Sequence, residues 1–207
     1  MLLAEPMTVV TDWVLAVLAV ALGVRLLRPS APLPRRLVAL SFFLLAAAAL
    51  VGGGVHGWAP RLAAGVRENL WRSIYAGIGL ANLLLLAGVV LATVPPRLGA
   101  LLVGLLGLRF AVFLALAFGR DFGFVMGDLV LTLLVLAGFG AFFTLARPRP
   151  FAPWLLGGVL VSFVAALVQT HRLAPHAFFN HNDLFHVIQM GGLCLFYRAA
   201  RDLPDRP

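Results

Sequence analysis

The chain has 207 residues, of which 62% are hydrophobic and only 12% are charged, and its formal net charge is +8. A soluble domain of this size carries roughly twice that share of charged residues, so the composition excludes an ordinary soluble protein and indicates an integral membrane protein. All 16 basic residues are arginines. Most of them flank apolar stretches, where they orient helices, so the positive charge does not indicate nucleic-acid binding. The one cysteine, Cys194, excludes an intrachain disulfide and a four-thiolate zinc site.

Seven apolar stretches are long enough to cross a bilayer, which takes about 20 residues of α-helix. In chain order they are 8–27, 37–56, 70–93, 98–118, 122–145, 152–170 and 183–199. Short connections containing proline separate most of them. We therefore predict an all-α membrane protein, with a single seven-helix transmembrane domain over residues 1–207 in a bacterial inner membrane.

The distribution of charge predicts the orientation of this bundle. Glu5 and Asp12 precede most of the first stretch and arginines follow it, which is not the pattern of a cleaved signal peptide. With the N-terminus outside, ten arginines lie on the inner side and five on the outer side, while Arg109 lies within a stretch. Because cytoplasmic loops carry the excess of arginine, the N-terminus is expected outside and the C-terminus inside.

The other polar residues gather at one end of the predicted bundle. All five histidines and six of the eight carboxylates fall on the outer side, and only Asp202 and Asp205 lie on the inner side. This convergence depends on the number of helices and not on which side is outside. Polar groups close to hydrocarbon are costly, so the convergence predicts a functional site.

The densest polar motif is residues 178–190, FFNHNDLFHVIQM, at the start of the last stretch. Residues three or four apart share one face of a helix. That face would carry Asn182, Asp183, His186 and Gln189. Helix capping is the competing interpretation, with Asn180 or Asn182 as the N-cap and Asp183 at the positive end of the helix. Capping explains the asparagines and the aspartate, but it does not explain a histidine one turn deeper.

A metal site would explain that histidine. Histidine and carboxylate are the usual ligands of zinc, and three protein ligands plus a water form a catalytic centre. The candidate ligands are His56, His181 and His186, with Asn182 or Asp183 assisting. His181 lies five residues before His186, so it reaches the same centre only if the helix begins after it.

Two candidate site residues, His56 and Glu68, also fit ordinary roles. His56 follows Gly52-Gly53-Gly54-Val55, where glycines allow another backbone or a ligand to approach closely, but a lone histidine at a helix end is commonly an interfacial residue. Glu68 is a candidate general base, and it equally fits a solvated carboxylate paired with Arg72 four residues later. Both interpretations stay open.

Arg109 and Asp128 lie well inside their stretches, on the order of 10 Å deep at 1.5 Å per residue. An unpaired charge at that depth is costly, so we predict that the two residues form an intramembrane ion pair. The pair could be a structural clamp or a contact with substrate.

The arrangement resembles the alkaline ceramidase / adipoQ-receptor / Per1 superfamily of seven-helix membrane hydrolases. The likeness rests on His56 ending the second stretch, Glu68 shortly after it, and Leu184-Phe185-His186-Val187 opening the seventh. Asp12-Trp13 is similar to a pair in the calcium-binding stretch of the ceramidases. The resemblance implies a zinc ion held by three histidines, whose bound water attacks a lipid amide or ester.

The motifs also depart from the family pattern. Asn182 stands where the family has a second histidine of the seventh helix, and His181 is displaced by one position. Gly52 replaces the serine four residues before the histidine of the second helix, and further acidic residues of the calcium stretch are absent.

The sequence thus predicts a metal-dependent membrane hydrolase acting on a lipid amide or ester. Zinc would be bound by His56, His181 and His186, Glu68 and Asp183 would be catalytic, and Asp12 and Asn182 would be further contacts, including any calcium contact. The alternative is a non-enzymatic binding or transport protein that uses the same cluster for a ligand or protons. A third possibility is a haem held between His56 and His186.

Overall fold

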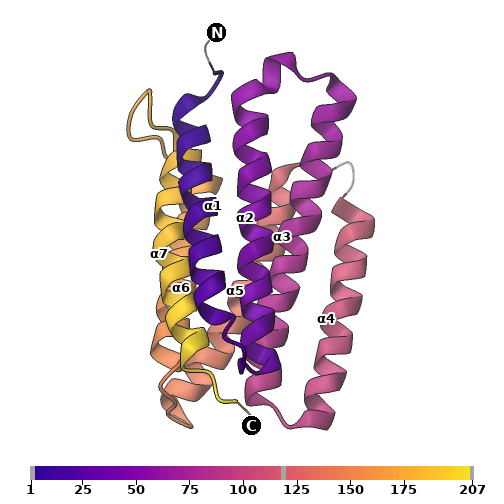
Figure 1. Ribbon diagram of the computed structural model, residues 1–207, viewed down its shortest axis with the longest axis vertical. Helices are drawn as coiled ribbons and strands as arrows, with labels where there is room; N and C mark the ends of the chain where they lie inside the picture. The colour runs from indigo at the N-terminus through magenta and orange to yellow at the C-terminus, as the bar shows by residue number, and fades with distance from the viewer. Residues whose placement is uncertain (1–2, 118–119, 206–207) are drawn as a thin grey trace.

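In a computed structural model, which describes residues 3–117 and 120–205, the chain forms seven long α-helices and one short 3₁₀ turn (Figure 1). In chain order these are α1 (Pro6–Leu26), α2 (Leu33–Trp58), η1 (Ala59–Arg61), α3 (Ala64–Thr93), α4 (Pro96–Ala117), α5 (Phe122–Leu145), α6 (Ala152–Thr170) and α7 (His181–Arg201). The described residues contain no strand beyond one isolated bridge between His176 and Phe179.

The predicted all-α fold is confirmed, and each predicted stretch falls on its own helix. The main differences between predicted and observed bounds are at two helix starts. Helices α2 and α3 begin before their apolar runs, at Leu33 and Ala64. Amphipathic first turns extend these helices past what hydropathy alone detects. Position 118, the end of the fourth predicted stretch, lies outside the described residues.

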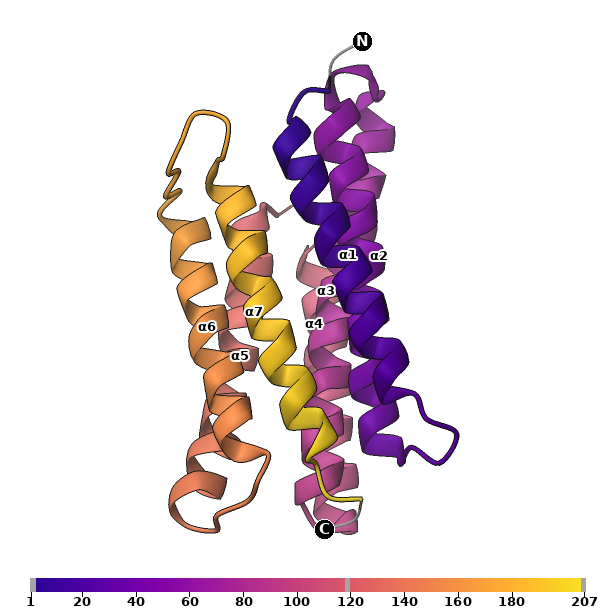
Figure 2. The same cartoon turned by 60° about the vertical axis from the view of Figure 1, so that its left-hand side comes forward.

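Six of the helices form a closed ring. Neighbours around it are α1, α2, α3, α5, α6 and α7, and α7 packs back against α1. Figure 2 shows α7 between α6 and α1, and Figure 1 shows α4 on the outside of the bundle, where it packs mainly on α3. The two termini lie at opposite ends of the bundle (Figure 1).

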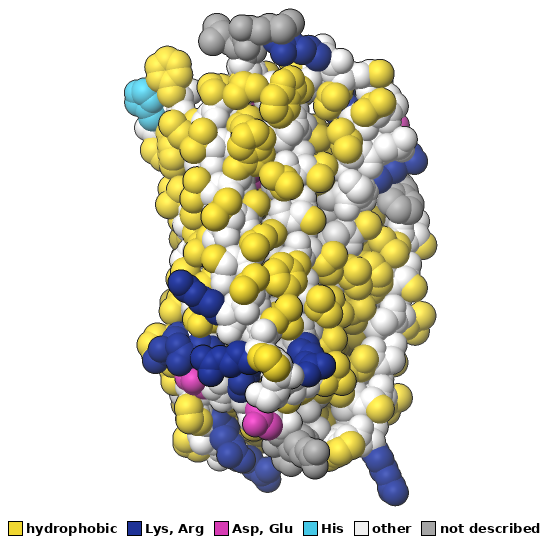
Figure 3. Space-filling view, in the orientation of Figure 1, with side chains coloured by type: hydrophobic (Ala, Val, Ile, Leu, Met, Phe, Trp, Pro, Cys, Tyr) yellow, Lys and Arg dark blue, Asp and Glu magenta, His cyan; other side chains and the backbone are white. Residues whose placement is uncertain are grey.

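Six helices, α1 to α6, are long and apolar enough to cross a membrane by length and composition, as judged over the described residues. The remaining helix, α7, carries polar residues in its first turns, and two of them, Asp183 and His186, are buried inside the ring. Figure 3 shows apolar side chains over the middle of one face and arginines gathered toward the end that holds the C-terminus. A band of exposed apolar side chains of this kind is typical of a membrane protein.

A close approach of α1 and α2 sets the position of Asp12. A Cβ atom added at Gly53 would lie 2.7 Å from Trp13 Nε1 and 3.1 Å from Asp12 Cβ. Only glycine accommodates this approach without a shift of the neighbouring side chains. Gly53, which has no side chain, therefore lets the start of α1 pack closely against the end of α2.

The predicted ion pair between Arg109 and Asp128 is confirmed. Arg109 of α4 contacts the Asp128 carboxylate of α5, and the same guanidinium donates to the Asp128 carbonyl at 2.9 Å and to the Thr132 hydroxyl at 2.7 Å. Asn82 of α3 donates to the other Asp128 oxygen at 2.8 Å. This clamp joins the outer helix α4 to two helices of the ring.

Replacing Arg109 by leucine should destabilise the protein by about 3–5 kcal/mol, because it leaves the Asp128 carboxylate buried without its partner. The double change Arg109→Leu with Asp128→Leu should recover most of that loss, since apolar pairs replace buried ion pairs at little cost. Denaturant unfolding in detergent measures both. Arg97→Leu, an exposed position in the first turn of α4, is the matched control and should have little effect. A double variant no more stable than Arg109→Leu would contradict the clamp.

Candidate functional site

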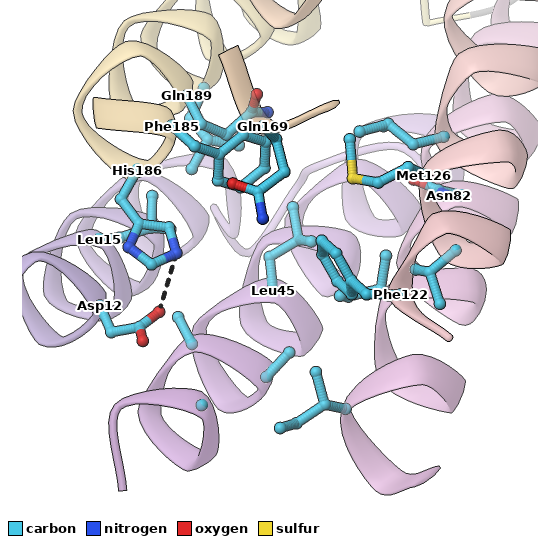
Figure 4. A pocket seen from close by; sticks show the side chains of 18 of the residues that line it. Asp12, Leu15, Leu45, Asn82, Phe122, Met126, Gln169, Phe185, His186 and Gln189 are labelled. Atoms are coloured by element: carbon cyan, nitrogen blue, oxygen red, sulfur yellow. Dashed lines mark ion pairs between the residues drawn. The ribbon is translucent and has the colours of Figure 1, made fainter. Parts of the chain in front are cut away.

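The ring encloses a cavity of about 260 Å³ (Figure 4). All six ring helices contribute to its lining, and α4 contributes no residue. Most of the wall is apolar, from side chains such as Leu45, Phe122 and Met126. The polar lining residues are Asp12, His56, Asn82, Thr132, Gln169, Asn182, His186 and Gln189.

The first turn of α7 is fixed by a capping box. The Asn180 side chain accepts hydrogen bonds from the backbone N–H groups of Asn182 at 2.7 Å and Asp183 at 3.3 Å. Asp183 in return accepts from the Asn180 backbone N–H at 2.7 Å. The predicted capping role of Asn180 and Asp183 is thus confirmed, and it sets where α7 begins. The register of this turn then directs His186 toward α1.

Asp12 and His186 meet inside the ring. His186 Nε2 lies 3.3 Å from Asp12 Oδ1, and the contact joins the second turns of α1 and α7 (Figure 4). Both residues are buried, with 3% of Asp12 and 9% of His186 exposed. Buried ionisable groups are stable only when each has a partner, so this contact stabilises the junction of the two helices.

Thr11 binds the other nitrogen of the His186 ring. Its hydroxyl lies 3.1 Å from His186 Nδ1, 3.2 Å from the Thr8 carbonyl and 3.4 Å from Asp183 Oδ1. If the hydroxyl donates to one of the oxygens, Nδ1 carries a proton; if it donates to Nδ1, Nε2 carries one. Thr11 does not line the cavity, so it positions the imidazole rather than facing a ligand.

His56 has an acidic partner that the sequence did not suggest. Its Nδ1 lies 3.3 Å from Glu5 Oε2, just before α1. Its ring also packs edge-on against Trp71, with centroids 5.6 Å apart. Glu5 accepts from the Thr8 hydroxyl at 3.3 Å, so the segment before α1 is tied to both His56 and α1.

Three buried oxygens around this cavity have no hydrogen-bond partner among the described residues. They are Asp12 Oδ2, Gln169 Oε1 and Gln189 Oε1, and all three residues line the cavity. The Gln169 amide group donates to Asn182 at 3.0 Å, which leaves its own carbonyl oxygen as the unpaired atom. Each of these atoms is a hydrogen-bond acceptor.

The predicted site residues divide into two groups. Asp12, His56, Asn182 and His186 line the cavity together, as predicted from their convergence at one end of the bundle. His181, Glu68 and Asp183 do not line it. Glu68 lies on the exposed side of α3 and pairs with Arg72, the ordinary role left open for it.

A metal ion does not fit this arrangement well. No group of three or more His, Cys, Asp or Glu side chains in the described part of the chain is placed to hold a metal ion. Both ring nitrogens of His186 already have protein partners, which leaves none for a zinc ion or a haem iron. Among residues 3–117 and 120–205, Asp12 is the only acidic residue that lines the cavity, while calcium takes six to eight oxygen ligands.

Sequence reasoning missed Glu5, Thr11 and Gln169. Thr11 and Gln169 are polar residues within the apolar stretches 8–27 and 152–170, and that unusual placement was the signal available in the sequence. Their partners lie on α2 and α7, so no local pattern could have identified the contacts.

The comparisons with known proteins give a family but no activity. No curated protein and no solved structure matches this chain. One family profile matches residues 7–205, which is nearly the whole chain. The chain therefore belongs to DUF6962, a family of unknown function.

Proposed function

We propose that this protein is a membrane-embedded binding or transport protein for an amphiphilic molecule whose polar head donates hydrogen bonds. The observation that carries the proposal is the set of unpaired acceptor oxygens on Asp12, Gln169 and Gln189 around one apolar cavity. Pockets for small molecules combine an apolar wall with a few convergent polar groups, as this cavity does.

The chemistry of these atoms favours an amine head group. A buried acceptor without a donor costs roughly 1–3 kcal/mol, and a ligand that supplies donors removes that cost. A protonated primary amine has three N–H donors and one positive charge. Its charge complements the Asp12 carboxylate, and its remaining N–H donors complement the acceptor oxygens of Gln169 and Gln189. An alkyl tail would pack against apolar wall residues such as Leu45, Leu85 and Leu129.

The purified protein in nanodiscs should therefore bind dodecylamine more tightly than dodecanoate, which has the same chain length and an acceptor head. Asp12→Asn should weaken the binding of the amine about tenfold or more, because a hydrogen bond to a charged group contributes roughly 1.5–3 kcal/mol. Isothermal titration calorimetry, with empty nanodiscs as the blank, measures both affinities. Glu68→Gln removes a carboxylate outside the cavity and should leave the affinity unchanged. Equal affinity for amine and carboxylate would refute the proposal.

The second candidate is the metal-dependent hydrolysis of a lipid amide or ester. Its support is that His56, His186 and Asp12 face one cavity, in a chain whose motifs resemble those of the ceramidase superfamily. The Glu5–His56 and Asp12–His186 contacts would have to open before these side chains could share a metal ion.

Elemental analysis tests this second candidate. If it holds, the purified protein contains about one zinc per chain, as expected for a single catalytic centre, and both His56→Ala and His186→Ala lose it. His176→Ala, in the exposed connection before α7, is the control and should keep the metal. Zinc that persists in both variants, or no zinc after zinc has been supplied, would exclude the hydrolase.

We further propose that all seven helices cross a bacterial inner membrane with the N-terminus outside. The arginine excess at the C-terminal end supports this orientation. A C-terminal fusion to a reporter that is active only in the cytoplasm should be active, and the same fusion to a periplasmic reporter should be silent. The opposite pattern would reverse the orientation.

A further inference from the structure

A second cavity, of about 610 Å³, lies between α3, α4 and α5 at the end of the bundle that holds the C-terminus. Its wall is built from apolar side chains, including Phe139, Phe142 and Phe143 of α5. Phe142 and Leu98 at its edge are about half exposed, at 48% and 50%. The cavity therefore opens onto the apolar outer surface of the bundle, and it shares no lining residue with the cavity inside the ring.

Two arginines form the charged part of this lining. Arg147 and Arg149 lie in the connection between α5 and α6, and both line the cavity. Within residues 3–117 and 120–205, neither guanidinium forms a hydrogen bond or an ion pair, and no acidic residue lines the cavity. Two positive charges at this position are therefore not neutralised by the chain itself.

The adjoining backbone also favours an anion. Leu98 in the first turn of α4 and Phe151 at the N-cap of α6 both line the cavity. The N-terminal ends of helices carry a partial positive charge and free N–H groups. At α6 the Ala152 N–H already donates to the Arg149 carbonyl and Pro153 has no N–H, so this helix end contributes mainly its partial charge. Two helix N-termini and two arginines thus border the second cavity, which we call the chamber.

We propose that this chamber binds an anionic phospholipid, with its phosphate on Arg147 and Arg149 and one acyl chain against the phenylalanines. Free phosphate would not account for the apolar wall, and an uncharged lipid would leave both guanidiniums without a counter-charge. Basic pockets between transmembrane helices are suited to such head groups. This site is separate from the cavity inside the ring and does not depend on the function proposed for it.

Another arginine cluster at the same end has a different explanation. Arg25, Arg28, Arg35 and Arg201 line a polar cavity of about 150 Å³ together with Asp202. Arg35 pairs with Asp205 and donates to the Arg201 carbonyl. Arg25 and Arg201 lie in the last turns of α1 and α7, where cations balance the negative helix end. This cluster supplies the control for the test.

The role of the Arg147 and Arg149 charges in lipid binding is tested by native mass spectrometry of the protein with phosphatidylglycerol or with phosphatidylcholine of the same acyl chains. Wild-type protein should prefer phosphatidylglycerol. The double variant Arg147→Gln/Arg149→Gln should bind it about 25-fold more weakly, since each arginine near an anionic lipid contributes roughly a factor of five. Arg25→Gln/Arg28→Gln removes the same charge elsewhere and should keep the preference. Equal losses in the two double variants would mean general attraction by charge and would overturn the site.

The chamber is tested by filling it without a change of charge. Gly138 lines the cavity, and a Cβ added there meets no atom within 4 Å, so Gly138→Leu occupies the space meant for the acyl chain. Gly127→Leu, also in α5 and equally open, does not touch this cavity and is the matched control. Phosphatidylglycerol binding should fall in the first variant only, with the unfolding temperatures of the two compared to detect misfolding. Unchanged binding in a folded Gly138→Leu protein, or displacement of the lipid by inorganic phosphate alone, would overturn the proposal.

Discussion

The buried contact between Asp12 and His186 closes the ring of helices. It joins α1 to α7, which are the first and last helices of the chain, and it lies where most polar residues converge. Both helices run in the same direction from the same end of the bundle, so their second turns lie side by side (Figure 2). A connected set of polar residues surrounds this junction: Thr11 contacts the His186 ring, Asp183 contacts Thr11, and the Asn180 backbone N–H donates to Asp183.

The cost of burying polar groups explains the composition of α7. Its apolar stretch is the shortest of the seven predicted, and over its full length α7 is less apolar than the other six helices, yet it is a full member of the ring. Its asparagine, aspartate, histidine and glutamine side chains point to α1, α6 and the cavity rather than to lipid. A helix that turns its polar face to its neighbours, and residues such as Val187 outward, can carry polar residues that would be costly facing lipid.

Much of the fold could be predicted from the sequence, because each membrane span is a long local signal. The pairing of Arg109 with Asp128 was predictable for a similar reason, since two isolated charges at equal depth have few other partners. The convergence of Asp12, His56 and His186 also followed from counting helices. The pairing within that cluster did not, because it depends on helix rotation and on which helices are neighbours. Glu5 lies beside His56, and Asp12 and Thr11 contact the two ring nitrogens of His186.

The outer position of α4 has a consequence for the direction of the chain. In the ring, α3 is followed by α5, and the two run parallel, so the chain must return across the full height of the bundle between them. The helix α4 is that return, which explains why it is apolar on nearly all sides although it adds no residue to the inner cavity. Without this crossover α5, α6 and α7 would run the opposite way, and the second turn of α7, which carries His186, would lie at the far end of the bundle from Asp12. A helix with no part in the chemistry of the cavity thus determines that the two halves of its polar pair meet.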